Sequence, residues 1–258
     1  MGRGADPKVS IVIPARNEAR NLEMILPELP GAAEIILVDG HSVDDTVEIT
    51  KRLLPSAVVV TQTRTGKGNA LACGFEAATG DVVVMFDADG SADPAEIPAF
   101  VETLVRGADF AKGTRYREPG GSDDITILRR LGNSALNRLA NLLYDTAFSD
   151  LCYGYNAFWR DIVPQLGLPA ANAHAGRRLW GDGFEIETVL SCRVVGAGLK
   201  VAEVPSFERR RVFGETNLRT FSDGARVLRT IFSEYHRYRT RRRSGLPGTG
   251  DLAAQELA

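Results

Sequence analysis

GDVVVMFDADGSADP, residues 80–94, is the stretch that decides the fold. It joins a strongly apolar run at residues 82–86, which begins with three β-branched valines, to a polar turn that carries Asp87 and Asp89. A strand that is apolar at consecutive positions is typical of a parallel sheet covered by helices on both faces. We therefore expect residues 81–86 to form a central strand whose carboxyl end presents the two aspartates.

Short strands and helices alternate on the N-terminal side of this stretch. The expected strands are 9–13, 34–38 and 57–61, and the expected helices are 17–29, 44–54 and 69–78. Such alternation indicates βαβ units with right-handed crossovers. The predicted fold class is therefore α/β, with a mostly parallel central sheet flanked by helices.

The second half of the chain is less regular. The expected elements are helices at 95–106, 128–143, 184–195 and 222–235 and strands at 110–114 and 200–204. No stretch has the composition of a linker. We expect one domain at residues 8–235, followed by a basic and then flexible tail at 236–258.

The helix expected at residues 128–143 carries an apolar stripe. Leu131, Ala135, Leu139 and Leu142 fall on one helical face. We expect this face to pack on the core, and the alternative is that it docks on a membrane surface.

Composition excludes several classes of protein. The chain has 258 residues, of which 44% are hydrophobic and 25% charged, and its net charge is −2. These values are typical of a globular protein and not of a general polyanion binder. The longest apolar runs fall far short of the roughly 20 residues of a membrane-spanning helix. Three separated cysteines match no disulfide framework, and the N-terminus lacks a signal-peptide core, so we expect a cytoplasmic protein.

Positive charge is concentrated near the C-terminus. Residues 207–243 contain eleven arginines and four acidic residues, a net charge of +7. The run at 237–243, RYRTRRR, is either a solvated tail or a surface for an anionic membrane, where each basic residue contributes roughly 1 kcal/mol. Because the rest of the chain is acidic, nucleic-acid binding is not expected. We favour peripheral attachment to the inner face of the membrane.

Polar residues follow the predicted strands, at the edge where ligands bind in open α/β sheets. Asp39 after the second strand suits either a ligand site or a turn. Asp87 and Asp89 repel each other, and a divalent cation with oxygen ligands relieves that repulsion. A solvated turn is the alternative, but the position at a strand end favours a metal, which also neutralises a departing diphosphate.

The segment Gly66-Lys67-Gly68-Asn69 opens a helix after the third strand. It is not a P-loop, because the preceding glycine spacing and the following Ser or Thr are absent. Its glycines still allow backbone amides to approach an anion, and Lys67 adds a positive charge.

Four motifs follow one another over the N-terminal half: VSIVIPARNEARNL, ILVDGHSVDDT, GKGNAL and GDVVVMFDADGSADP. Their order and spacing resemble family 2 glycosyltransferases with the GT-A fold. The later FERRRVFGETNL looks like the closing motif of the branch that contains dolichol-phosphate mannose synthases and bacterial polyprenol-phosphate glycosyltransferases. The resemblance extends over residues 8–235.

The resemblance implies roles for the residues that match the family motifs. Nucleotide-sugar binding is implied for Pro14, Ala15, Arg16, Asn17, Glu18, Asp39, Lys67, Asp87, Ala88, Asp89, Arg211 and Thr216. The implied ligands of Mg²⁺ or Mn²⁺ are Asp87, Asp89 and Ser91. Arg115 in the motif GTRY is expected near the reacting phosphates, and Arg211 and Gly214 in the loop that closes over the donor.

The implied activity is inverting, metal-dependent transfer of a hexose from a UDP- or GDP-linked sugar to polyprenyl phosphate. Ser134 and Asn217 stand where this branch has an arginine and a lysine, and YGYNA at 153–157 replaces SGFRA. Each difference removes a cation, so a soluble or glycan hydroxyl remains an alternative acceptor. The processive QxxRW motif is absent, which indicates a single transfer.

A hydroxyl acceptor requires a carboxylate base, whereas a lipid phosphate, with a second pKa near about 6, is already largely anionic. Asp182 in GDGFE is the expected catalytic base and Glu185 the other candidate, although both also suit the start of a helix. A sugar-phosphate nucleotidyltransferase is a more remote alternative, because its Gly-rich loop after the first strand is missing. A non-catalytic nucleotide-binding protein has no use for Asp87 and Asp89.

Overall fold

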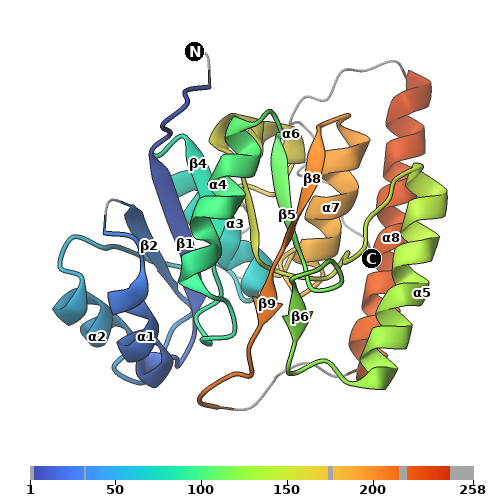
Figure 1. Cartoon of the computed structure of the whole chain (residues 1–258). Coiled ribbons are helices and arrows are strands. Elements are labelled where there is room, and N and C mark those ends of the chain that lie inside the picture. The colour runs from blue at the N-terminus through green and yellow to red at the C-terminus, as the bar shows by residue number, and fades with distance from the viewer. Residues whose placement is uncertain (1–2, 32, 174–176, 215–219, 245–258) are drawn as a thin grey trace.

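The computed structural model describes residues 3–31, 33–173, 177–214 and 220–244, and within them a seven-stranded sheet forms the centre (Figure 1). Its strand order is β3-β2-β1-β4-β7-β5-β8. The strands are β1 (Val9–Ala15), β2 (Glu34–Asp39), β3 (Val58–Thr61), β4 (Val82–Met85), β5 (Phe110–Thr114), β7 (Asn156–Trp159) and β8 (Val201–Pro205). A small second sheet pairs β6 (Gly121–Ser122) with β9 (Phe207–Glu208).

Helices flank the central sheet, as expected for an α/β fold. They are α1 (Ala19–Ile25), α2 (Thr46–Leu53), α3 (Lys67–Ala77), α4 (Ile97–Val105), α5 (Ile127–Tyr144), α6 (Val163–Leu166), α7 (Ile186–Gly196) and α8 (Thr220–Ser244). Short 3-10 turns are η1 (Leu26–Glu28), η2 (Pro94–Glu96) and η3 (Arg160–Ile162). The predicted mostly parallel sheet is confirmed, since β1 to β4 run parallel.

Strand β7 was not predicted, and it lies between β4 and β5, antiparallel to both. It is fully buried although it begins with the polar Asn156. The Asn156 side chain donates hydrogen bonds to the carbonyls of Tyr153 and Gly154, whereas its Oδ1 has no partner among the described residues. Because β7 owes its burial to its two neighbours, local sequence gave little sign of it.

The core lies between the sheet and its helices, and α3 packs closely on β1 and β2. A Cβ atom added at Gly74 of α3 would lie 2.2 Å from Val12 Cγ1 on β1 and 3.1 Å from Val38 Cγ2 on β2. Only glycine therefore permits this approach. The close packing sets the position of Lys67 at the start of α3.

Helix α5 corrects the expectation of a core-facing apolar stripe. Leu131 and Leu142 are 65% and 81% exposed. Of the expected stripe, Leu139 does pack against a core cluster. The buried face combines Ala140 and Tyr144 with asparagines: Asn137 Oδ1 accepts the N–H of Leu151 at 2.9 Å, and Asn141 Oδ1 accepts that of Phe148 at 2.8 Å. The chain after α5 folds back along the helix, and amide side chains satisfy its backbone groups where leucines would not.

Helices α5 and α8 lie side by side and share a second, smaller core with α7 (Figure 1). Tyr144 at the end of α5 packs against Tyr235 and Tyr238 of α8. The last helix was expected to stop at residue 235, but α8 continues to Ser244, so the basic run at 237–243 is helical. Among the described residues, no helix is both long and apolar enough to cross a membrane.

Candidate active site

The carboxyl ends of β1 and β2 bring the first predicted group of residues together. Pro14 and Ala15 end β1, and Ala15 pairs in register with Asp39 at the end of β2. Asn17 Oδ1 accepts the N–H of Val43 at 2.8 Å, and so ties the two loops beyond these strands to each other. Arg16 and Asn17 are exposed beside this junction.

Asp87, Ala88 and Asp89 follow β4 at the same edge of the sheet. Ala88 is buried, whereas the Asp87 and Asp89 side chains are 34% and 24% exposed. Asp89 Oδ1 accepts hydrogen bonds from the Ser91 backbone at 3.0 Å and the Ser91 hydroxyl at 2.7 Å. The turn therefore presents both carboxylates outward and holds one of them in place.

Lys67 is the cation nearest Asp87. Its Nζ lies 2.7 Å from Asp87 Oδ1 and 2.7 Å from Glu187 Oε1 on α7. Burial by itself lowers the pKa of Lys67, but the two carboxylates raise it by more than burial lowers it. The net pKa therefore lies above the ordinary lysine value, and the group stays charged. A Cβ added at Gly154 would lie 3.1 Å from both Asp87 Oδ2 and Lys67 Nζ, so the chain after residue 153 closes over the cluster.

Residues 209–214, the closing segment, lie against Asp89. Arg211 Nη2 is 2.9 Å from Glu18 Oε1, and Arg211 Nε is 3.5 Å from Asp89 Oδ2. Phe213 donates its N–H to Asn21 Oδ1 at 3.1 Å, and Asn21 in turn donates to Glu18 Oε2 at 2.6 Å. Burial raises the pKa of Glu18, although Asn21 and Arg211 oppose the shift.

A cavity of about 220 Å³ opens between α1 and the closing segment, beside these contacts. Its lining includes Asn17, Glu18 and Arg211. Gly214, with φ of +82°, ends the described part of the segment, and Thr216 lies outside the described residues.

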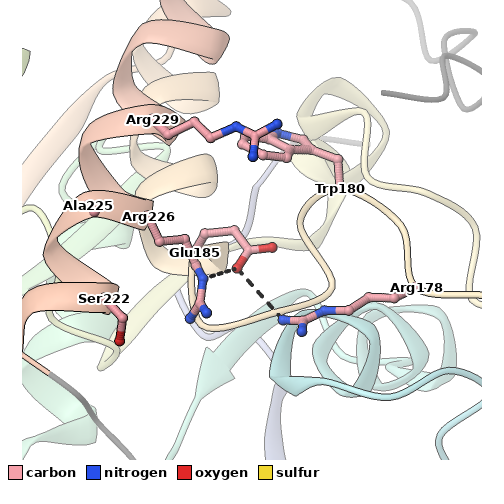
Figure 2. A pocket seen from close by; sticks show the side chains of 7 residues that line it. All are labelled: Arg178, Trp180, Glu185, Ser222, Ala225, Arg226 and Arg229. Atoms are coloured by element: carbon pink, nitrogen blue, oxygen red, sulfur yellow. Dashed lines mark ion pairs between the residues drawn. The ribbon is translucent and has the colours of Figure 1, made fainter. Parts of the chain in front are cut away.

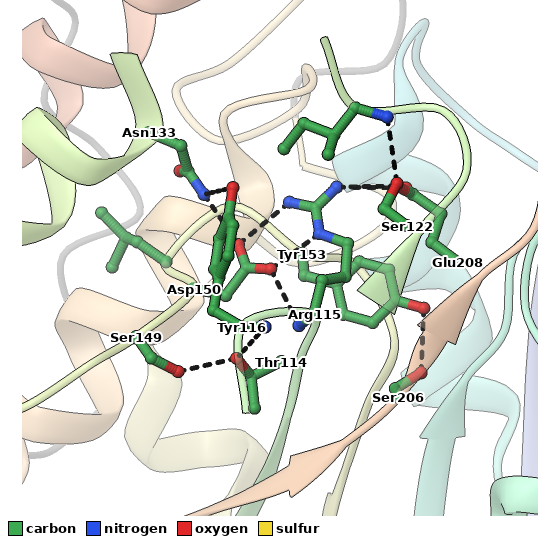
Figure 3. Close-up of polar contacts among 12 residues, drawn as sticks. Thr114, Arg115, Tyr116, Ser122, Asn133, Ser149, Asp150, Tyr153, Ser206 and Glu208 are labelled. Atoms are coloured by element: carbon green, nitrogen blue, oxygen red, sulfur yellow. Dashed lines mark hydrogen bonds and ion pairs between the residues drawn. The ribbon is translucent and has the colours of Figure 1, made fainter. Parts of the chain in front are cut away.

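Arg115, which was expected near the reacting phosphates, is bound by carboxylates on two sides (Figure 3). Its Nε and Nη2 contact the two oxygens of Asp150 at 2.7 and 3.0 Å, and its Nη1 lies 3.0 Å from Glu208 Oε2 on β9. Burial alone raises the pKa of Asp150, but Arg115 lowers it more, so the net pKa lies below the ordinary value. The ion pair between Arg115 and Glu208 links the end of β5 to β9, the strand that directly precedes the closing segment.

Asp182, the expected catalytic base, is also bound by an arginine. Arg64 Nε and Nη2 contact its two carboxylate oxygens at 2.8 and 2.9 Å, and both side chains are buried. Arg64 Nη1 also donates to the carbonyls of Ala170, Ala171 and Ala173. This geometry gives Asp182 the place of a structural counterion and not that of an exposed proton acceptor.

Comparison with known proteins identifies the family. The model for glycosyl transferase family 2 matches residues 10–167. The chain belongs to this family. Polyprenol monophosphomannose synthase of Mycolicibacterium smegmatis is 30% identical over 251 residues, which cover 90% of each chain. Dolichol-phosphate mannosyltransferase of Pyrococcus furiosus is 30% identical over 228 residues, covering 82% of this chain and 59% of that protein.

Solved structures agree with the fold. Glucosyl-3-phosphoglycerate synthase from Mycobacterium tuberculosis, solved with Mn²⁺ and UDP, matches with a TM-score of 0.65 at 22% identity, over 90% of this chain and 81% of that one. This supports the GT-A fold of the family 2 glycosyltransferase. Because the chain belongs to glycosyl transferase family 2, the two alternative functions considered above, a sugar-phosphate nucleotidyltransferase and a non-catalytic nucleotide-binding protein, are excluded.

The structure also brings to this site residues that the sequence did not single out. Glu187 is the second glutamate of GDGFEIE, and only folding brings it to Lys67. Arg64 lies 118 positions from Asp182, too far for any spacing pattern to connect them. The sequence offered one signal for each residue. Glu187 is a charge within a mostly apolar stretch, and Arg64 is a charge just before the glycines at 66 and 68.

Proposed function

We propose that this glycosyltransferase moves one hexose from a UDP- or GDP-linked sugar to polyprenyl phosphate, with a divalent metal, at the cytoplasmic face of the membrane. The observation that supports the donor half is that two carboxylates beyond β4 each lie beside a cation: Asp87 beside Lys67, and Asp89 beside Arg211 of the closing segment. The relatives named for polyprenol and dolichol phosphates support the acceptor half.

The residues present fit a divalent cation. Asp87 and Asp89 are partly exposed carboxylates on one turn, the oxygen ligands that Mg²⁺ and Mn²⁺ prefer. No cluster of three or more His, Cys, Asp or Glu occurs in the part of the chain described. We therefore expect the donor diphosphate and water to complete the coordination, with Ser91 supporting Asp89. When bound, the metal neutralises charge on the departing diphosphate.

Arg211 supplies a second positive charge for that diphosphate. It lies 2.9 Å from Glu18 and 3.5 Å from Asp89, so the closing segment contacts two of the residues proposed to bind the donor. In the proposed reaction an acceptor phosphate oxygen bonds to the anomeric carbon as the bond from that carbon to the diphosphate breaks. The electron pair of the broken bond stays on the leaving diphosphate, which Arg211 stabilises.

The same step favours a phosphate acceptor over a hydroxyl. A phosphate oxygen is already ionised, so no base has to remove a proton. Of the two carboxylates considered for that role, Asp182 is held by Arg64, and Glu185 lies between Arg178 and Arg226.

The exposed face of α5 supports docking on a membrane that holds such an acceptor. Ile127, Leu128, Leu131 and Leu142 are exposed on this face, and α8 alongside ends in the basic run 237–243. Apolar side chains enter the interface while arginines bind anionic headgroups.

Replacing Leu128 and Leu131 together by serine is therefore expected to weaken binding to anionic vesicles by about 10-fold or more, since full burial of one leucine contributes about 1.5–3 kcal/mol. Sedimentation with phosphatidylglycerol vesicles measures this. Val105→Ser on α4 is the matched control and should bind as the wild type does. Unchanged binding of the double variant would reject α5 as the docking face.

Transfer assays test the function itself. Labelled UDP- and GDP-hexoses are offered with polyprenyl phosphate in vesicles, and separately with soluble glycosides that have only hydroxyl groups. We expect label in the lipid phosphate fraction, dependent on Mg²⁺ or Mn²⁺ and lost with EDTA. Transfer to a glycoside and not to the lipid phosphate would establish the hydroxyl acceptor instead.

A further inference from the structure

A second cavity, of about 350 Å³, lies between the segment before α7 and the first turns of α8 (Figure 2). Its lining includes Arg178, Trp180 and Glu185 from that segment and Ser222, Arg226 and Arg229 from α8. We call it the arginine pocket. None of the residues expected to bind the nucleotide sugar lines it.

Glu185 lies at the base of the pocket and is only 6% exposed. Its Oε1 accepts the Gly183 N–H at 3.1 Å, whereas its Oε2 has no hydrogen-bond partner among the described residues. Arg226 Nε and Arg178 Nη2 lie 3.9 and 4.0 Å from that Oε2, on either side of it (Figure 2). These distances are too long for hydrogen bonds, so the carboxylate attracts both guanidinium groups without occupying those two donors.

The lining favours an anion. Three arginines face one glutamate, which leaves an excess of positive charge even though Arg226 Nη1 also contacts Asp223 at 2.8 Å. Guanidinium groups match phosphate oxygens in paired hydrogen bonds. Trp180 is held in place because its Nε1 donates to Glu234 at 2.8 Å, and the Arg229 guanidinium lies over its ring, 5.8 Å from the centroid, so the ring positions this cation at the pocket (Figure 2).

We propose that the arginine pocket binds a phosphate monoester and that, if the proposed function holds, this is the acceptor's phosphate. Glu185 is two residues from Glu187, which holds Lys67 and through it Asp87, so the pocket and the donor site share one short segment. Arg115, the cation expected near the reacting phosphates, is bound by Asp150 and Glu208. In the arginine pocket, Arg178 Nη2 and Arg226 Nε lie 4.0 and 3.9 Å from Glu185, beyond hydrogen-bonding distance, although Arg226 Nη1 contacts Asp223.

Calorimetric titration with farnesyl phosphate and with inorganic phosphate tests the proposal. Arg178→Gln and Arg226→Gln are each expected to weaken phosphate binding at least about 10-fold. Arg106→Gln, which removes an exposed arginine on α4, is the matched control and should bind as the wild type does. Weaker binding of both probes supports a pocket that recognises phosphate alone, and weaker binding of farnesyl phosphate only supports one that also requires the lipid.

The proposal is overturned if neither probe binds the wild type, or if both variants bind with wild-type affinity. Thermal stabilisation by UDP or GDP with Mn²⁺, measured on the same variants, separates this inference from the proposed function. Retained nucleotide stabilisation with unchanged phosphate binding would remove the pocket alone. Phosphate binding that depends on Arg178 and Arg226, in a protein that transfers no hexose to polyprenyl phosphate, would leave the pocket and remove its assignment to the acceptor.

Discussion

Asp89→Asn is expected to lower the hexose-transfer rate at least about 100-fold while the protein stays folded. The metal that Asp89 would hold stabilises transition-state charge by several kcal/mol, and each 1.36 kcal/mol is a factor of ten in rate. Asparagine keeps an oxygen that accepts the Ser91 hydrogen bonds, so the turn after β4 has no reason to rearrange. The loss therefore reports charge and not structure.

Two measurements check this prediction. Initial rates give the loss of transfer, and thermal unfolding with UDP or GDP, with and without Mn²⁺, gives the loss of metal-dependent stabilisation. Asp145→Asn is the matched control: Asp145 is exposed at the end of α5 with φ of +52°, a conformation that asparagine also accepts. Full turnover in Asp89→Asn would refute the metal assignment.

Arg64→Met is expected to lower the free energy of unfolding by about 3–5 kcal/mol. The change leaves the buried Asp182 carboxylate without its counterion, which is the costly way to break a buried ion pair. It also removes the donors to the carbonyls of Ala170, Ala171 and Ala173. Denaturant titration measures the loss, and Arg64→Met with Asp182→Leu should recover part of it, because no uncompensated charge then remains.

A surface pair provides the comparison. Arg52→Met breaks an exposed contact with Glu23 and should cost no more than about 1 kcal/mol. The result also bears on the role of Asp182. A catalytic base would make Asp182→Asn inactive at wild-type stability, whereas the counterion role predicts that stability falls.

That the residues expected to bind the donor lie at one edge of the sheet was largely predictable, because it depends on local sequence. Asp39 ends one recognisable buried strand and Asp89 follows another after a short turn, and parallel strands that end at one sheet edge bring such residues together. No distant partner had to be known. Arg211 was found through its motif, and the structure places it against Asp89.

Pairing over long distances in the sequence was not predictable. Arg115 and Asp182 stand at positions where motif and resemblance implied chemistry, yet each is held by a charged partner from another element. The arginine pocket combines a loop with the start of α8, and its central Glu185 was considered only as a base or a helix residue. Side-chain type shows that a charge is present, but not which neighbour neutralises it.

Helix α5 illustrates the same limit on packing. Its sequence determined that Leu131 and Leu142 share a face, because helical periodicity is a local property. Whether that face points inward was decided by the chain that folds back after α5 and binds Asn137 and Asn141. The sequence by itself determined the α/β class and the carboxylates at the strand ends, which depend on near neighbours. Only the tertiary structure decided which charges are paired, which apolar face is exposed and where β7 inserts, because each depends on contacts between distant segments.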